Sequence, residues 1–180
     1  MESSNLIIRE STFSDCIYFA EWESKQYIIN GFTISKGRDY EEITREFVIR
    51  TLDSDKLQFT IVKRDEDKPI GRVYISRIDP LSDSLDITRI YIGEEEYLNK
   101  GLGEETLRLI LDYCFIHLHT ARETLDHLPD NIKAANLYKK LGFQYEGILR
   151  HSGKKDGKYV DLHLMSMLRA EYYEKCNRHI

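Results

Sequence analysis

The chain has 180 residues, of which 41% are apolar and 32% are charged, and its formal net charge is −5. A chain of this length forms one domain by default and buries roughly 70% of its unfolded surface, so it needs neither disulfides nor a metal to fold. The composition excludes a disordered, collagenous or coiled-coil chain, and the acidic balance disfavours nucleic-acid binding.

The sequence carries no signal for a membrane or an oxidising compartment. No apolar run approaches the roughly 18 residues of a membrane span, and the N-terminus lacks the pattern of a secretory signal. The three cysteines are too scattered for a disulfide framework or a zinc site. We therefore expect a cytoplasmic protein with no membrane contact and no metal.

The first half of the chain predicts strands separated by two helices. Short apolar runs rich in β-formers indicate strands, and apolar residues at helical spacing indicate helices. The predicted elements are a strand at Leu6–Arg9, helices at Thr12–Ser24 and Asp39–Leu52, and strands at Leu57–Val62, Pro69–Ile78 and Leu85–Ile92.

The second half alternates helices and strands and ends in a hairpin. We expect helices at Gly101–His119 and Ile132–Leu141, a strand at Glu123–Leu128, and hairpin strands at Gln144–His151 and Lys158–Met167 around a turn at 152–157. Asn131 or Asp130 would cap the second helix, and Gly142 would end it. Antiparallel meanders followed by strand–helix–strand units predict a mixed sheet with helices on its faces, an α+β domain.

A glycine pair follows the strand that ends at Ile92. After a polar loop, Lys100, Gly101 and Gly103 stand where the next helix begins. The first amides of a helix lack intrahelical partners and carry the positive end of its dipole, and glycine lets a phosphate approach them. The spacing fits neither a Walker loop nor a dinucleotide fingerprint. A phosphate site and a plain glycine turn both remain open from this loop alone.

A second pattern lies in the helix after Asn131. Asn131, Ala134 and Tyr138 fall on one face over nearly two turns. Small alanines would let a ligand lie along this face, with the tyrosine hydroxyl one turn further. An amphipathic helix with a capping asparagine and a half-buried tyrosine explains the pattern equally well.

Together the two segments resemble the GNAT superfamily of acetyl-coenzyme A-dependent N-acetyltransferases. The stretch LNKGLG is similar to the family's Q/R-x-x-G-x-G/A loop, and NIKAANLYKKLGF to its N-x-x-A-x-x-x-Y-x-K-x-GF helix. The tail GILRHSGKKDGKYVDLHLMSM resembles the closing hairpin of the RimJ/RimL-like branch, and spermidine acetyltransferases share much of the pattern. The likeness runs from about Leu6 to Met167. It departs at Leu98, where the family has Gln or Arg.

The resemblance implies a fold, a co-substrate and site residues. It implies a single GNAT-like domain over residues 1–180, with a central, mixed, mostly antiparallel twisted sheet and helices on both faces. Acetyl-coenzyme A would be the co-substrate, and Tyr138 the general acid that protonates the departing thiolate. The residues that would hold the cofactor are Ile90, Tyr91, Ile92, Leu98, Asn99, Lys100, Gly101, Leu102, Gly103, Glu104, Asn131, Ala134, Asn136 and Tyr138.

The general base and the acceptor stay open. The strand position that carries a glutamate in many relatives is Ile87 here, and His127 is an alternative base for which a structural role is the simpler interpretation. Glu21, Trp22 and Glu23 either bind a cationic amine or form an ordinary helix end. Glu94–Glu96 and Lys154–Lys155 are expected to be solvated.

Two classes of function follow from these patterns. The first is an acetyl-coenzyme A-dependent acyltransferase in which the amine attacks directly. Its acceptor would be a small-molecule amine (a polyamine or amine antibiotic) or a protein N-terminus, and a homodimer stays open. The alternative is a non-catalytic coenzyme A-binding sensor or interaction module with the same fold, motivated by Leu98 and Ile87.

Overall fold

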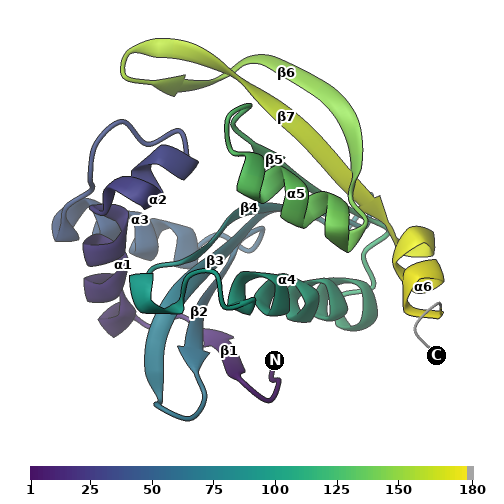
Figure 1. The fold of residues 1–180 in the computed structure, drawn as a ribbon, viewed down its shortest axis with the longest axis horizontal. Coiled ribbons are helices and arrows are strands. Elements are labelled where there is room, and N and C mark those ends of the chain that lie inside the picture. Colours follow the sequence, from purple (N-terminus) through teal and green to yellow (C-terminus); the bar gives the residue numbers. More distant parts are fainter. Residues whose placement is uncertain (178–180) are drawn as a thin grey trace.

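One seven-stranded sheet organises residues 1–177, the part of the chain that the computed structural model describes (Figure 1). The strand order is β1-β2-β3-β4-β5-β7-β6, and only the β4–β5 pair is parallel. The strands are β1 (Leu6–Glu10), β2 (Leu57–Lys63), β3 (Lys68–Asp79), β4 (Ser84–Ile92), β5 (Arg122–His127), β6 (Gln144–Lys155) and β7 (Lys158–Leu168). The predicted mixed, mostly antiparallel sheet is confirmed.

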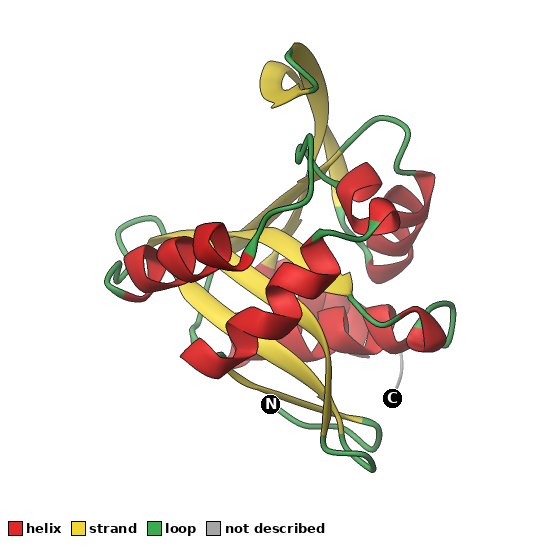
Figure 2. Ribbon diagram, turned by 90° about the vertical axis from the view of Figure 1, so that its left-hand side faces the viewer, coloured by secondary structure: helices red, strands yellow, loops and turns green. Residues whose placement is uncertain are grey.

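Helices cover both faces of this sheet (Figure 2). The α-helices are α1 (Cys16–Glu23), α2 (Gln26–Gly31), α3 (Tyr40–Thr51), α4 (Leu102–Asp112), α5 (Ile132–Leu141) and α6 (Arg169–Asn177). One apolar core joins the sheet to α4 and α5, and a second, smaller core joins α1, α2 and α3 to Tyr91 of β4. The predicted α+β arrangement is therefore confirmed.

Local side-chain chemistry explains where the helices begin and end. Asp39 and Glu42 exchange hydrogen bonds with each other's backbone amides at the start of α3. Asn131, not Asp130, caps α5 by accepting from the Ala134 amide at 3.2 Å. Gly142 ends α5 with φ +105°, a left-handed conformation that favours glycine.

Several predicted boundaries were wrong. The helix expected over 12–24 opens with a short 3-10 turn (Phe13–Asp15), and the helix expected over 101–119 changes at Asp112 into a π-helix (Tyr113–His117). In the hairpin, β6 continues to Lys155 and β7 begins at Lys158, so the turn between them has two residues instead of the six that were predicted. Helices α2 and α6 and the 3-10 turn Glu95–Tyr97 (η2) were not predicted.

Candidate functional site

The two central strands separate halfway along their length. β4 and β5 pair only at Ser84–Asp86 with Arg122–Thr124, and beyond Asp86 no described strand pairs with the β5-facing edge of β4. This edge offers unpaired backbone groups of Ile90–Ile92 to a ligand.

Two cavities of about 340 and 290 Å³ meet at this splay. The larger one extends toward α2 and β5, and the smaller one toward the start of α4. They share six lining residues, so they form one continuous cleft: Ile90, Tyr91, Ile92, Leu98, Ala134 and Tyr138. All six belong to the predicted site.

A β-bulge decides which side chains of β4 reach the cleft. Tyr74 of β3 pairs with Arg89 of β4, and Ser76 pairs with Asp86. One residue therefore separates the paired positions on β3, whereas two separate them on β4. The extra residue reverses the alternation, so Ile87 packs into the α4 core while Arg89 turns toward α1. The Ile87 side chain therefore points into the core and lines neither cavity.

The loop before α4 presents free amides. Asn99 and Gly101 have φ of +60° and +80°, and no described group accepts from the amides of Leu102, Gly103 and Glu104. A Cβ on Gly101 or Gly103 would meet nothing within 4 Å. Packing therefore does not require glycine at 103, and the space beside it is open to a ligand.

Not every predicted loop residue is available to a ligand. The Leu98 amide donates to the Glu95 carbonyl at 3.1 Å and is not free for a phosphate, although Leu98 lines both cavities. Lys100 is exposed, with its Nζ 5.3 Å from the centre of the Tyr97 ring. The Glu104 carboxylate pairs with Arg108 and Lys140, which removes its side chain from the loop.

Helix α5 supplies the opposite wall. Asn131 and Ala134 line the larger cavity, and Asn131 also donates to the Gly31 carbonyl at 3.3 Å, which ties α5 to the end of α2. Asn136 is exposed and lines neither cavity. Its predicted contact with the cofactor finds no support in this arrangement.

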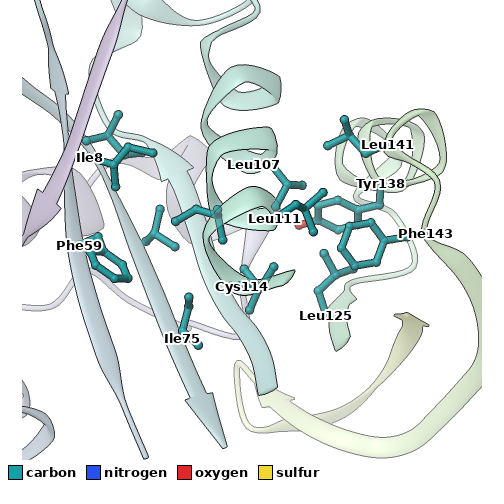
Figure 3. Packing of buried hydrophobic residues seen from close by; sticks show 14 of the residues in the cluster. Ile8, Phe59, Ile75, Leu107, Leu111, Cys114, Leu125, Tyr138, Leu141 and Phe143 are labelled. Atoms are coloured by element: carbon teal, nitrogen blue, oxygen red, sulfur yellow. The ribbon is translucent and has the colours of Figure 1, made fainter. Parts of the chain in front are cut away.

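Tyr138 stands where the two cavities meet. Its side chain is 8% exposed and packs beside Phe143 and Leu141, facing α4 (Figure 3). No described group forms a hydrogen bond with its hydroxyl. Burial, and then the charges of Asp126 and Asp86, raise the pKa of Tyr138 above its ordinary value. The phenol therefore stays protonated at neutral pH.

Asp126 of β5 is a site residue that the sequence did not reveal. It lines the larger cavity together with Tyr138. Although its side chain is accessible to solvent, desolvation by the surrounding protein and then the charge of Asp86 raise its pKa to about 6, against an opposing effect of Arg77. Asp86 is itself buried and accepts hydrogen bonds from Thr88 at 2.7 Å and Thr124 at 2.8 Å.

His127 lies next to Asp126 and also lines the cavity. Its Nδ1 lies 2.8 Å from the Leu128 carbonyl, and its ring centroid is 6.2 Å from that of Tyr138. The contact with the backbone carbonyl and the burial of the ring agree with a structural role for His127.

A buried charge network lies behind the α1 side of the cleft. Fully buried Glu23 accepts hydrogen bonds from Arg38, Arg72, Arg89 and the Tyr91 hydroxyl. Burial alone would raise the pKa of Glu23, but Arg89, Arg72 and Arg38 outweigh it and lower the value to about 2. Glu23 is thus committed to arginines, and buried Trp22 donates to Glu94 at 2.9 Å. These contacts leave neither side chain free for an amine, which favours the other interpretation, an ordinary helix end.

The tip of the β6–β7 hairpin is fastened to α2. Lys155 donates from Nζ to the carbonyls of Ile29, Asn30 and Phe32 at 2.8–3.2 Å, and the Asp156 amide donates to Ser35. Figure 1 shows the hairpin reaching beyond the sheet toward α2. Lys154 is exposed as expected, but the prediction that Lys155 is solvated was wrong.

Residues 1–177 show neither a membrane-spanning helix nor a cluster of metal ligands. None of their helices is long and apolar enough to span a membrane. No group of three or more His, Cys, Asp or Glu side chains among them is arranged to hold a metal ion.

Comparisons with known proteins agree with this arrangement. The family model described as an acetyltransferase (GNAT) domain matches residues 5–144. The N-acetyltransferase p20 of Bacillus licheniformis is 27% identical over 94% of this chain and 96% of its own length. The spermine/spermidine N(1)-acetyltransferase of Bacillus subtilis is 31% identical over 51% of each chain.

A solved structure shows the same fold. Spermidine N-acetyltransferase from Vibrio cholerae, in complex with CoA and spermine, superposes with a TM-score of 0.85 at 23% identity. The match covers 95% of this chain and 99% of that one.

Proposed function

The chain belongs to the GNAT acetyltransferase family, and from this premise we propose that it transfers the acetyl group of acetyl-coenzyme A directly to the primary amine of a small molecule. The observation that carries the proposal is the continuous cleft with Tyr138 at its centre. One arm leads to the free amides of α4, and the other leads to the polar groups of β4 and β5. Two substrates could therefore meet at one phenol.

The smaller cavity is the proposed seat of coenzyme A. The amides of Leu102–Glu104 at the positive end of α4 would hold the diphosphate, and the open space over Gly101 and Gly103 leaves room for it. The free edge of Ile90–Ile92 would pair with the amide-bearing arm, and Ala134 leaves space beside it. The bound co-substrate supplies the activated acetyl group.

Proton transfer is the proposed task of Tyr138 and Asp126. A protonated phenol at the junction of the cavities can donate to the departing thiolate. An alkyl amine with a pKa near 10.4 is only about 0.04% neutral at pH 7, so the nucleophile needs a base. Asp126 lines the acceptor cavity, and a carboxylate with a pKa of about 6 is ionised yet basic enough to accept a proton there.

Direct attack is supported by what lines the cleft. No cysteine or serine, the commonest nucleophiles of acyl-enzymes, is among the residues that line either cavity, which favours direct attack by the amine. Relatives named for spermidine and spermine support a small-molecule amine as the acceptor, with the polyamine as one member of that class. An amine antibiotic would be another member of that class, and a protein N-terminus is the competing acceptor.

Thiol release with a panel of amines tests the proposal. The panel contains polyamines, aminoglycosides, amino acids and N-terminal peptides. Turnover on at least one small amine is expected, and Tyr138→Phe should lower it by about 10²–10⁴ while coenzyme A still binds. Coenzyme A binding without turnover on any amine would contradict the proposal and favour a sensor. An unchanged rate in Tyr138→Phe would remove the phenol from the mechanism.

A further inference from the structure

The larger cavity has an unusual pair of charged side chains for an amine site. Among the residues that line it, Asp126 is the one carboxylate and Arg89 the one guanidinium. They come from the two strands that separate, β5 and β4, and so flank the cavity. A site for a polycation would be expected to offer several carboxylates and no arginine.

The guanidinium group of Arg89 is held by hydrogen bonds on one edge only. Its Nη1 donates to both carboxylate oxygens of Glu23, at 3.0 and 3.3 Å, while its Nη2 and Nε donate to no described residue. The side chain is 12% exposed, and it lines the cavity. A guanidinium held in this way is preorganised to form a charge-assisted hydrogen bond with an anion in the cavity.

The network behind Arg89 has a surplus of positive charge. Two carboxylates, Glu23 and Glu46, are connected by ion pairs to four guanidinium groups: Arg38, Arg50, Arg72 and Arg89. Two negative and four positive charges leave a local charge of +2, in a chain whose formal net charge is −5. Glu23 and Glu46 therefore do not balance the four guanidinium groups together, and an anionic ligand group beside Arg89 would reduce the surplus.

We infer that the acceptor is a small zwitterionic amine, whose amine lies by Asp126 and whose carboxylate binds Arg89. The inference rests on the proposed function and narrows its substrate class to amino acids and similar molecules. A polyamine would instead place a second ammonium group against Arg89. A cavity of about 340 Å³ is of a size for a small molecule.

Matched pairs of amines test the inference. Each pair joins an amino acid to its amide, for example phenylalanine with phenylalaninamide and glutamine with glutaminamide, and spermidine is measured beside them. The α-amine of an amide has a pKa near 8, so at pH 7 basicity alone favours the amide over the amino acid. We nevertheless expect kcat/KM to be about 10- to 100-fold higher for the carboxylate member, because it adds a hydrogen bond between charged groups.

Variants of Arg89 test whether this residue causes the preference for the carboxylate member of each pair. Arg89→Met should abolish the preference for the carboxylate member, and Arg89→Lys should retain part of it. Arg38→Met is the matched control, because Arg38 also pairs with Glu23 but does not line the cavity, and it should keep the preference. Thermal melts establish that each variant folds. If Arg89→Met does not fold, the amine pairs on the wild-type protein still decide.

The outcomes separate this inference from the proposed function. Acetylation of amides or spermidine at least as fast as of amino acids would overturn the inference and leave the acetyltransferase intact. A preference that survives in Arg89→Met would also overturn it. Absence of turnover on every amine would overturn both.

Discussion

Replacing Gly103 should separate stability from coenzyme A binding. Gly103 lies in the first turn of α4, and a Cβ there would meet no described atom within 4 Å. Gly103→Val should therefore leave the melting temperature of the free protein within about 2 °C of the wild type, because valine exceeds glycine in helix propensity by only a few tenths of a kcal/mol. The branched side chain would, however, occupy the space proposed for the diphosphate.

The expected loss of affinity follows from the amides that the valine would screen. Each hydrogen bond to a charged group contributes about 1.5–3 kcal/mol, so losing even one weakens binding by about 10- to 100-fold. Calorimetric titration with coenzyme A measures this, and Gly103→Ala is the matched control, since its methyl group leaves most of the space open. If Gly103→Val binds coenzyme A as tightly as the wild type, the diphosphate does not lie on these amides.

Three further changes test other parts of the site. Asp126→Asn should lower kcat/KM by about 10²–10⁴ and remove the fall in wild-type activity below about pH 6, as followed by pH–rate profiles. Burial raises the pKa of Glu123 to about 8, so the folded state binds more protons than the unfolded state, and stability should fall from about pH 5 to 8 by roughly 1 kcal/mol per pH unit. Glu123→Gln should flatten this slope in urea unfolding. Lys155→Met should raise the acceptor KM and lower the melting temperature without changing coenzyme A affinity, whereas the exposed neighbour Lys154→Met should change neither.

Most of the sheet could be predicted from local sequence, because alternating β-formers and turn residues report on pairing between neighbours. Where prediction failed, a distant contact decides the structure. The six residues of α2 include the adjacent β-branched residues Ile28 and Ile29, which favour a strand. The helix is stabilised at its C-terminal end by Lys155, more than 120 residues away, which donates hydrogen bonds to its carbonyls. Lys155 is also the last residue of β6, beyond the predicted end of that strand at His151.

The site was predictable where a single segment carries the chemistry. Gly101, Gly103 and Tyr138 belong to contiguous motifs, and the fold brings them to one cleft. Asp126 and Arg89 belong to no such motif. The β4 bulge turns Arg89 away from the core face of Ile87, and the strand splay opens Asp126 to the cavity. Neither effect leaves a mark in local spacing, and so both residues required the structure.

A crystal structure with bound coenzyme A would show where the diphosphate and the sulfur lie in the cleft. We expect the diphosphate within hydrogen-bonding distance of the amides of Leu102–Glu104, and the sulfur beside the Tyr138 hydroxyl. A diphosphate bound elsewhere, or a sulfur remote from that hydroxyl, would contradict this expectation.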